Sequence, residues 1–420
     1  MKANFLALMK NRIPFSEVAG KEIPTPDQRI SGMRALLMLV CSVALAAATS
    51  LLLYGLLTLM NAIPVYSGLP GESRYLQEQD ILILIVPVIT ALIISCLLHY
   101  TGNLSAKKIR PIQSILMICS GIPLGLEGPL TDMPFSISTS NSRRIHILSV
   151  ACMTAGLAFL FGAPLMAVAL SIELLIVELT WLGIIAAIAG GGTGFLLRYM
   201  LIGETAIWSM PDVPSANIHM LLGYIVAGVL AGLLVLPTGK LMSLTNALFQ
   251  RLPLNKLWWP VLAAGIVGIT GYYLPETFGA GYDHIEAMLN GQITLQFLVI
   301  MMIGKLVLMA IVIASGIPGG TMAPLIVAGG AAGIFITFLL QFAFPGVHLH
   351  VAVAALVGMS AMFSAGNRVL LSAILFAIET THALNALLPV ICACTAAYTV
   401  VYLLTKRKTA VQSTFVENVS

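Results

Sequence analysis

Ten stretches of this chain are apolar over lengths near those that cross a lipid bilayer, for which a helix needs about 20 residues. Charged residues make up only 9% of the chain and the mean hydropathy is +0.98, whereas soluble domains carry about 25% charged residues. The sequence therefore predicts an all-α polytopic membrane protein. The apolar stretches run roughly over 35–63, 81–98, 147–172, 181–198, 220–237, 257–274, 297–314, 324–345, 349–365 and 387–404.

The chain divides by composition into four parts. We expect a cytoplasmic N-terminal segment (1–34), a first membrane half (35–200), a second membrane half (220–405) and a short cytoplasmic tail (406–420) without a soluble regulatory domain. Six basic residues precede the first span, and Lys406, Arg407 and Lys408 follow the last. The excess of Lys and Arg on cytoplasmic loops places both termini in the cytoplasm.

Several classes of function leave no trace in the sequence. The net charge is +4 and the basic residues form no run interleaved with aromatic ones, so no nucleic-acid partner is expected. The six cysteines show no CxxC spacing and the seven histidines no HExxH, which argues against a metal site. No Ser/His pair or paired aspartate lies inside the spans, so we expect neither an enzyme nor a cofactor.

The strongest pattern is an internal repeat. The segment SGIPLGLEGPL at 120–130 recurs 195 positions later as SGIPGGTMAPL at 315–325, with seven of eleven positions identical. A weaker echo follows each copy, in which Glu173 matches Glu379. The chain therefore consists of two related halves.

Glycine and proline are expected to interrupt helices in both halves. Gly162-Ala163-Pro164 and the run 190–194 both predict breaks, and broken backbone at membrane depth is found only where it is buried in protein or lines a cavity. Gly128-Pro129 and Ala323-Pro324 indicate helix starts, since proline is favoured at the first helical position. Interrupted helices of this kind surround the binding sites of transporters.

A helix that starts inside the membrane presents unpaired N–H groups and the positive end of its dipole at that depth. Two such starts can replace the hydration shell of a small anion without any full positive charge. The candidate anion-binding residues at the two breaks are Gly125, Leu126, Gly128, Gly320, Thr321, Met322 and Ala323.

Glu127 lies within the first break, where its carboxylate would compete with an anion for the same N–H groups. Ionised, it would fill the anion site; protonated or swung aside, it would leave that site open. The sequence thus predicts a gate that can also carry a proton. The alternative is that Glu127 only caps a helix N-terminus, as acidic residues commonly do.

Three other ionisable residues lie in apolar surroundings. Glu173 and Glu379 end apolar helices at equivalent places, and a paired structural role, such as accepting N–H bonds from a neighbouring break, is favoured over transport. Lys305 interrupts the 297–314 stretch. It either adds positive potential near a pore, snorkels to the interface or pairs with one of these glutamates.

The combined motifs resemble those of the CLC family of chloride channels and chloride/proton antiporters. Segment 125–129 is similar to the family's GxEGP signature, segment 319–324 to its GGxFAP signature, and segment 279–282 to a glycine-rich turn. The resemblance implies chloride transport by a homodimer with one pore per subunit. It also implies two inverted halves with tilted and broken helices, a gate at Glu127, and location in the inner (plasma) membrane of a bacterium.

One departure from the family concerns protons. In antiporters of the family a proton-relaying glutamate follows the residue that matches Glu173, and here that position is Leu174. The chain in this respect resembles family members that act as channels. Glu178 or water could take over the relay, so channel and proton-coupled exchange both stay open.

Other departures concern the anion site. Met322 replaces the aromatic residue of GGxFAP. The family's serine-bearing loop is best matched by Thr101-Gly102-Asn103, and its tyrosine near the end of the membrane region by Phe415. The alternative function is another inverted-repeat secondary transporter, for a cation or an amino acid. A cation site should show membrane-embedded acidic pairs, whereas the acids here are mainly isolated.

Overall fold

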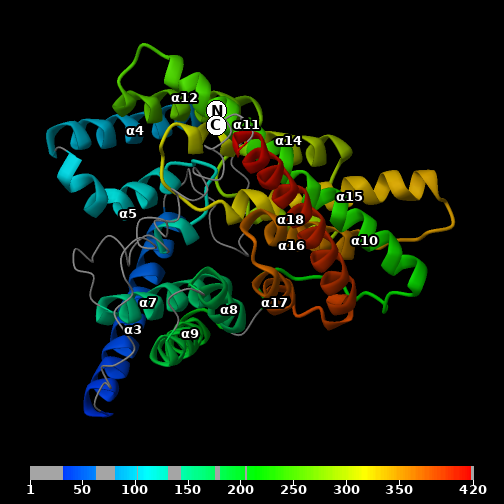
Figure 1. Ribbon diagram of the computed structural model, residues 1–420, viewed down its shortest axis with the longest axis horizontal. Coiled ribbons are helices and arrows are strands. Elements are labelled where there is room, and N and C mark those ends of the chain that lie inside the picture. Colours follow the sequence, from blue (N-terminus) through cyan, green and yellow to red (C-terminus); the bar gives the residue numbers. More distant parts are fainter. Residues whose placement is uncertain are drawn as a thin grey trace.

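The computed structural model describes residues 32–62, 81–101, 103–130, 143–175, 180–203 and 206–417. Side chains at 32, 34, 60–62, 101, 103–109, 143, 175 and 406–417 lie outside the description. The described part is helical apart from its turns, in agreement with the predicted all-α class (Figure 1). Eight helical segments in it are long and apolar enough to cross a membrane.

In the first half, three helices gather on one side of the molecule, and a short fourth lies beside them (Figure 1). The helices of this half are α3 (Gly32–Ala62), α4 (Ile81–Thr101), α5 (Asn103–Cys119), α7 (Arg143–Phe161), α8 (Pro164–Leu175) and α9 (Trp181–Leu201). Helices α3, α7 and α9 pack together, and α8 lies between α7 and the second half.

The second half builds most of the buried core. Its helices are α10 (Ile218–Leu233), α11 (Val235–Arg251), α12 (Trp259–Tyr273), α13 (Asp283–Leu289), α14 (Leu295–Ala314), α15 (Met322–Ala343), α16 (Val351–Asn367), α17 (Leu370–Thr381) and α18 (Leu387–Glu417). Helix α16 is almost entirely buried, and α15 is buried from Met322 to Ile334. They are surrounded by α10, α14 and α18 (Figure 1).

The predicted interruption at Gly162 is present. The stretch 147–172 is split there into α7 and α8, because Gly162 has a φ of 55°, a backbone conformation that glycine adopts without steric cost. The buried Arg198 donates to the carbonyls of Phe159 (2.9 Å) and Leu160 (3.3 Å). It thereby satisfies carbonyl groups that the end of α7 leaves without helical partners.

The predicted interruption at 190–194 is wrong. This glycine run continues as regular helix within α9. A Cβ at Gly190 would overlap the backbone of Ala151, and one at Gly194 the backbone of Ala155. The glycines serve the close approach of α9 to α7, which is the common use of small residues between membrane helices.

The two prolines of the repeat are also placed differently from the prediction. Helix begins at Glu127 in the first copy and at Met322 in the second, so Pro129 and Pro324 occupy the third helical position rather than the first. The position costs no hydrogen bond, because the N–H groups of a first turn have no helical partners.

Candidate functional site

The two copies of the repeat meet in space. Gly125 and Gly320 exchange backbone hydrogen bonds in both directions, each with an N···O distance of 3.0 Å. They form a single antiparallel bridge between the two halves. Residues 195 positions apart in sequence are therefore adjacent at the centre of the protein.

The two copies also fold alike. Gly121 and its counterpart Gly316 have φ values of 93° and 90°, which favour glycine. The hydroxyls of Ser120 and Ser315 each donate to the carbonyl three residues earlier at 2.7 Å. The repeat seen in the sequence is thus a repeat of backbone conformation that ends in a helix start.

The carboxylate of Glu127 lies at the start of α15. Its Oε1 accepts hydrogen bonds from the backbone N–H groups of Met322 (2.9 Å) and Ala323 (3.2 Å). The residue is buried, with 6% of its surface exposed. These are N–H groups that the α15 helix leaves unpaired, and the helix dipole adds to their attraction for negative charge. A carboxylate from the first half thus occupies the helix start of the second.

Glycines make room for this carboxylate. A Cβ at Gly125 or at Gly320 would overlap the carboxylate group of Glu127. At Gly128 a Cβ would instead overlap the backbone of Gly319 and Gly320. The first two glycines therefore admit the glutamate, and the third keeps the two halves in contact.

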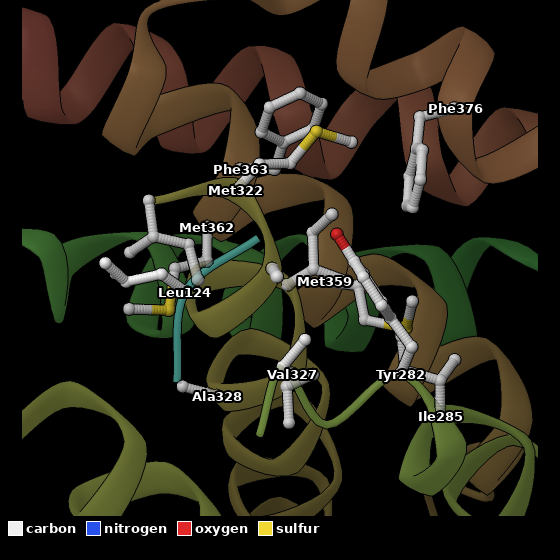
Figure 2. Packing of buried hydrophobic residues seen from close by; sticks show 14 of the residues in the cluster. Leu124, Tyr282, Ile285, Met322, Val327, Ala328, Met359, Met362, Phe363 and Phe376 are labelled. Atoms are coloured by element: carbon white, nitrogen blue, oxygen red, sulfur yellow. The ribbon is translucent and has the colours of Figure 1, made fainter. Parts of the chain in front are cut away.

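The other candidate residues of the two signatures have different surroundings. Leu126 and Met322 are buried in the hydrophobic core, and Figure 2 shows Met322 in the cluster with Phe363. The hydroxyl of Thr321 donates to Asn367 Oδ1 at 3.2 Å. Only the backbone N–H groups of Met322 and Ala323 reach the Glu127 carboxylate from this turn.

Tyr282 also contacts Glu127. The sequence predicted no role for Tyr282 beyond its place after the glycine-rich turn. Its hydroxyl donates to Glu127 Oε2 at 3.2 Å, and the residue is 1% exposed. Two glycines with positive φ, Gly279 (63°) and Gly281 (83°), shape the turn that delivers it. Figure 2 shows that its hydroxyl points away from Ile285. The signal in the sequence was a tyrosine directly after the glycines of an otherwise apolar turn.

Lys305 supports this turn from α14. Its ammonium group is fully buried and donates to the carbonyls of Thr277 (3.0 Å), Phe278 (3.1 Å) and Gly279 (2.7 Å). It neither snorkels nor bonds to Glu173 or Glu379. The lysine satisfies a turn whose carbonyl groups would otherwise be buried without donors.

Glu173 and Glu379 take the paired structural role that was favoured for them. Glu173 accepts from the N–H groups of Leu371 (2.8 Å) and Ser372 (2.9 Å) at the start of α17. Glu379 accepts from those of Leu165 (2.9 Å) and Met166 (2.7 Å) at the start of α8. Each glutamate ends one short helix and caps the other.

Leu174, which the family resemblance places at a proton-relay position, directly follows Glu173 in the sequence. Leu174 is half-buried on α8 and packs against the main hydrophobic core. Glu178, which could take over a relay, lies outside the described residues.

Nothing in the described part of the chain connects the remaining candidates to Glu127. Thr101 ends α4 and Asn103 begins α5, at the opposite end of α5 from Cys119 and the first break, and a helix of this length spans about 25 Å. Gly102 is outside the described residues. Phe415 lies in the last turn of α18 and its side chain is not described, so its role stays a prediction.

Helices that start inside the buried core and converge from two halves on one carboxylate are typical of membrane transport proteins. The chain belongs to the voltage-gated chloride channel (CLC) family, whose sequence model matches residues 93–402. The family resemblance and the multi-pass membrane fold are thereby confirmed. Because this family consists of transport proteins, the expectation that the chain is not an enzyme is confirmed as well.

Curated relatives from two genera are similar to this chain over about two-thirds of its length. The H(+)/Cl(-) exchange transporter ClcA of Vibrio campbellii is 27% identical over 288 residues, which are 65% of this chain and 61% of that protein. The ClcA of Klebsiella pneumoniae is 27% identical over 291 residues, or 66% and 61% of the two chains. The match thus spans about three-fifths of the length of these relatives.

Two solved structures share the fold. A slow cyanobacterial Cl-/H+ antiporter superposes with a TM-score of 0.70 at 22% identity, covering 90% of this chain and 99% of that one. A CLC-type fluoride/proton antiporter gives 0.67 at 21% identity, covering 88% and 96%. These likenesses confirm a CLC fold for the chain.

Proposed function

We propose that the protein moves small monovalent anions, chloride first among them, across a membrane, and that Glu127 is the gate. The observation that carries the proposal is the position of the Glu127 carboxylate on the N–H groups of Met322 and Ala323. A carboxylate held by two backbone N–H groups supports an anion site at this place. A chloride ion could take it only when the carboxylate is protonated or rotates away.

The chemistry of the place favours an anion over the alternative substrates. A cation site needs convergent carboxylates or carbonyl oxygens, and Glu127 is held here by N–H and O–H donors. An amino-acid substrate would need partners for its ammonium group as well as for its carboxylate. The partial charges of helix N–H groups suit an ion that must also leave again.

Passive movement is favoured over proton exchange by Leu174, which cannot carry a proton, and by Glu173, whose carboxylate is engaged at the start of α17. The H(+)/Cl(-) exchange for which the ClcA relatives are named is a property of those proteins. Proton-coupled exchange through Glu178 or water is the second candidate, and the same flux experiment separates the two.

The test is chloride flux from liposomes that contain the purified full-length chain. The wild-type chain should release chloride down its gradient, and Glu127→Gln should change that flux by about tenfold, since a charge-assisted hydrogen bond contributes roughly 1.5–3 kcal/mol. Asp212→Asn is the control, because this exposed carboxylate lies in the loop before α10. A flux that Glu127→Gln leaves unchanged would contradict the gate.

The assembly and placement belong to the same proposal. We infer a homodimer with one pore in each subunit, in the inner membrane of a bacterium with both termini in the cytoplasm. The family supports the dimer, and the basic residues at 406–408 support the orientation. Light scattering on the detergent-solubilised protein tests the first, and the activity of a reporter fused to the C-terminus tests the second.

A further inference from the structure

A buried hydroxyl group from the second half reaches the same carboxylate as the helix start. Tyr282 donates to Oε2 of Glu127, while the N–H groups of Met322 and Ala323 donate to Oε1. The hydroxyl and the N–H pair therefore face one another across the width of a single carboxylate. An ion that replaced the carboxylate would lie within reach of all three donors.

The tyrosine ring is fixed on several sides, so its hydroxyl stays in place when the glutamate leaves. The indole N–H of Trp208 donates to the Tyr282 carbonyl at 3.1 Å, and the Trp208 ring lies 6.1 Å from the Tyr282 ring. Phe161 packs edge-on at 5.7 Å. Such a donor needs no reorganisation on binding, which is the condition under which a fixed dipole stabilises charge best.

The turn before Tyr282 is anchored to both halves of the site. Gly279 N–H donates to the Gly121 carbonyl at 2.9 Å, and Lys305 holds the carbonyls of residues 277–279. A hydroxyl is moreover the only side-chain donor that the described residues show on Glu127. Thr101 and Asn103, expected to contribute to the anion site, lie where α4 ends and α5 begins.

We propose that the Tyr282 hydroxyl is a ligand of the transported anion, which it binds together with the N–H groups of Met322 and Ala323 once Glu127 has left. The proposal rests on the function proposed above and adds one specific residue to it. The ligand class is a small monovalent anion such as a halide. A neutral hydroxyl adds a directional hydrogen bond without the strong hold of a full positive charge.

The test is chloride titration by calorimetry on the purified full-length chain in detergent. Glu127→Ala supplies the reference, because it removes the competing carboxylate. Adding Tyr282→Phe should weaken the Kd for chloride by about tenfold or more, the loss expected for one hydrogen bond to a charged group. An equal Kd for the single and double variants would overturn the proposal.

The matched control is Tyr224→Phe in the same background. Tyr224 is equally buried, and its hydroxyl accepts a hydrogen bond from the backbone N–H of His350. Its loss should leave the Kd unchanged; a Kd weakened as much as by Tyr282→Phe would show a general packing effect and overturn the assignment.

Two further outcomes are separable. If neither Glu127→Ala nor wild type binds or transports chloride, the proposed function fails, and the Tyr282 assignment falls with it. If the double variant does not stay monodisperse, Tyr282→Phe alone is measured in liposomes. The chloride concentration for half-maximal flux should then rise about tenfold, and an unchanged value would overturn the proposal.

Discussion

Glu173 and Glu379 each cap the helix that carries the other. The helices involved, α8 and α17, have the same length and start 206 positions apart in the sequence. Since the C-terminal end of each meets the N-terminal end of its counterpart, the two run antiparallel. This is the relation expected of equivalent helices from two inverted halves, and it ties the halves together at a second place besides the Gly125–Gly320 bridge.

We expect Glu379→Gln to destabilise the protein by about 1–2 kcal/mol, because the start of α8 would lose a charged cap. Glu173→Gln should do the same at α17. Thermal unfolding in detergent measures both, and Asp212→Asn, which changes an acid in the loop before α10, is the control. If neither Glu173→Gln nor Glu379→Gln changed the unfolding temperature, the two caps would not stabilise the protein.

Chloride flux through the wild-type protein should rise as the pH falls. Protonation removes the negative charge of Glu127 and with it the attraction that holds the carboxylate on Met322 and Ala323. Glu127→Gln has no ionisable group at position 127, so the chloride flux through this variant should not vary with pH. Flux measured from pH 7.5 down to 4.5 tests the sign, and a parallel pH dependence in both proteins would place the sensor elsewhere.

Gly320→Ala should displace the Glu127 carboxylate without replacing Glu127 itself. The new methyl group would occupy the space of the Glu127 carboxylate, so we expect the flux to approach that of Glu127→Ala. In the Glu127→Ala background the same substitution should add little, because the clashing group is gone. Flux through the single and double variants forms a cycle, and additive effects would argue against this contact.

Gly128→Ala is the matched comparison. Its methyl group would strike the backbone of Gly319 and Gly320 rather than a side chain. We therefore expect loss of folded protein in size-exclusion chromatography, which Glu127→Ala does not rescue.

A chloride gradient should not drive protons uphill through the wild-type protein, because Leu174, which has no ionisable group, occupies the position where the family resemblance predicts the proton relay. Chloride and pH followed together in the same liposomes test this. Proton uptake against its own gradient would establish exchange, and Glu178 would then be the first residue to substitute.

Lys305→Met should cost roughly 3 kcal/mol or more, since three buried carbonyl groups would lose their donor. Lys240→Met, which removes an exposed lysine from α11, should cost little. Unfolding temperatures of the two variants provide the comparison. Equal temperatures would mean that water or another donor already satisfies the 277–279 turn.

The sequence predicted those features that depend on local pattern. Apolar length located the spans, and the repeat located both helix starts and Glu127. The run 190–194 was misjudged because a glycine run looks the same whether it breaks a helix or lets a neighbouring helix approach, and only the presence of α7 decides. The contact of Tyr282 with Glu127 joins residues 155 positions apart. No local pattern reports such a contact.

The bridge between Gly125 and Gly320 also has a consequence for a chain that is divided into its two halves. Neither half holds a complete binding place: one brings the carboxylate, the other the N–H groups and the hydroxyl. A chain cut in the loop before α10 would therefore regain a binding place only if both pieces were made together and found each other in the membrane. Because the two halves are joined backbone to backbone, we expect rotation of the Glu127 side chain, rather than separation of the halves, to open the path.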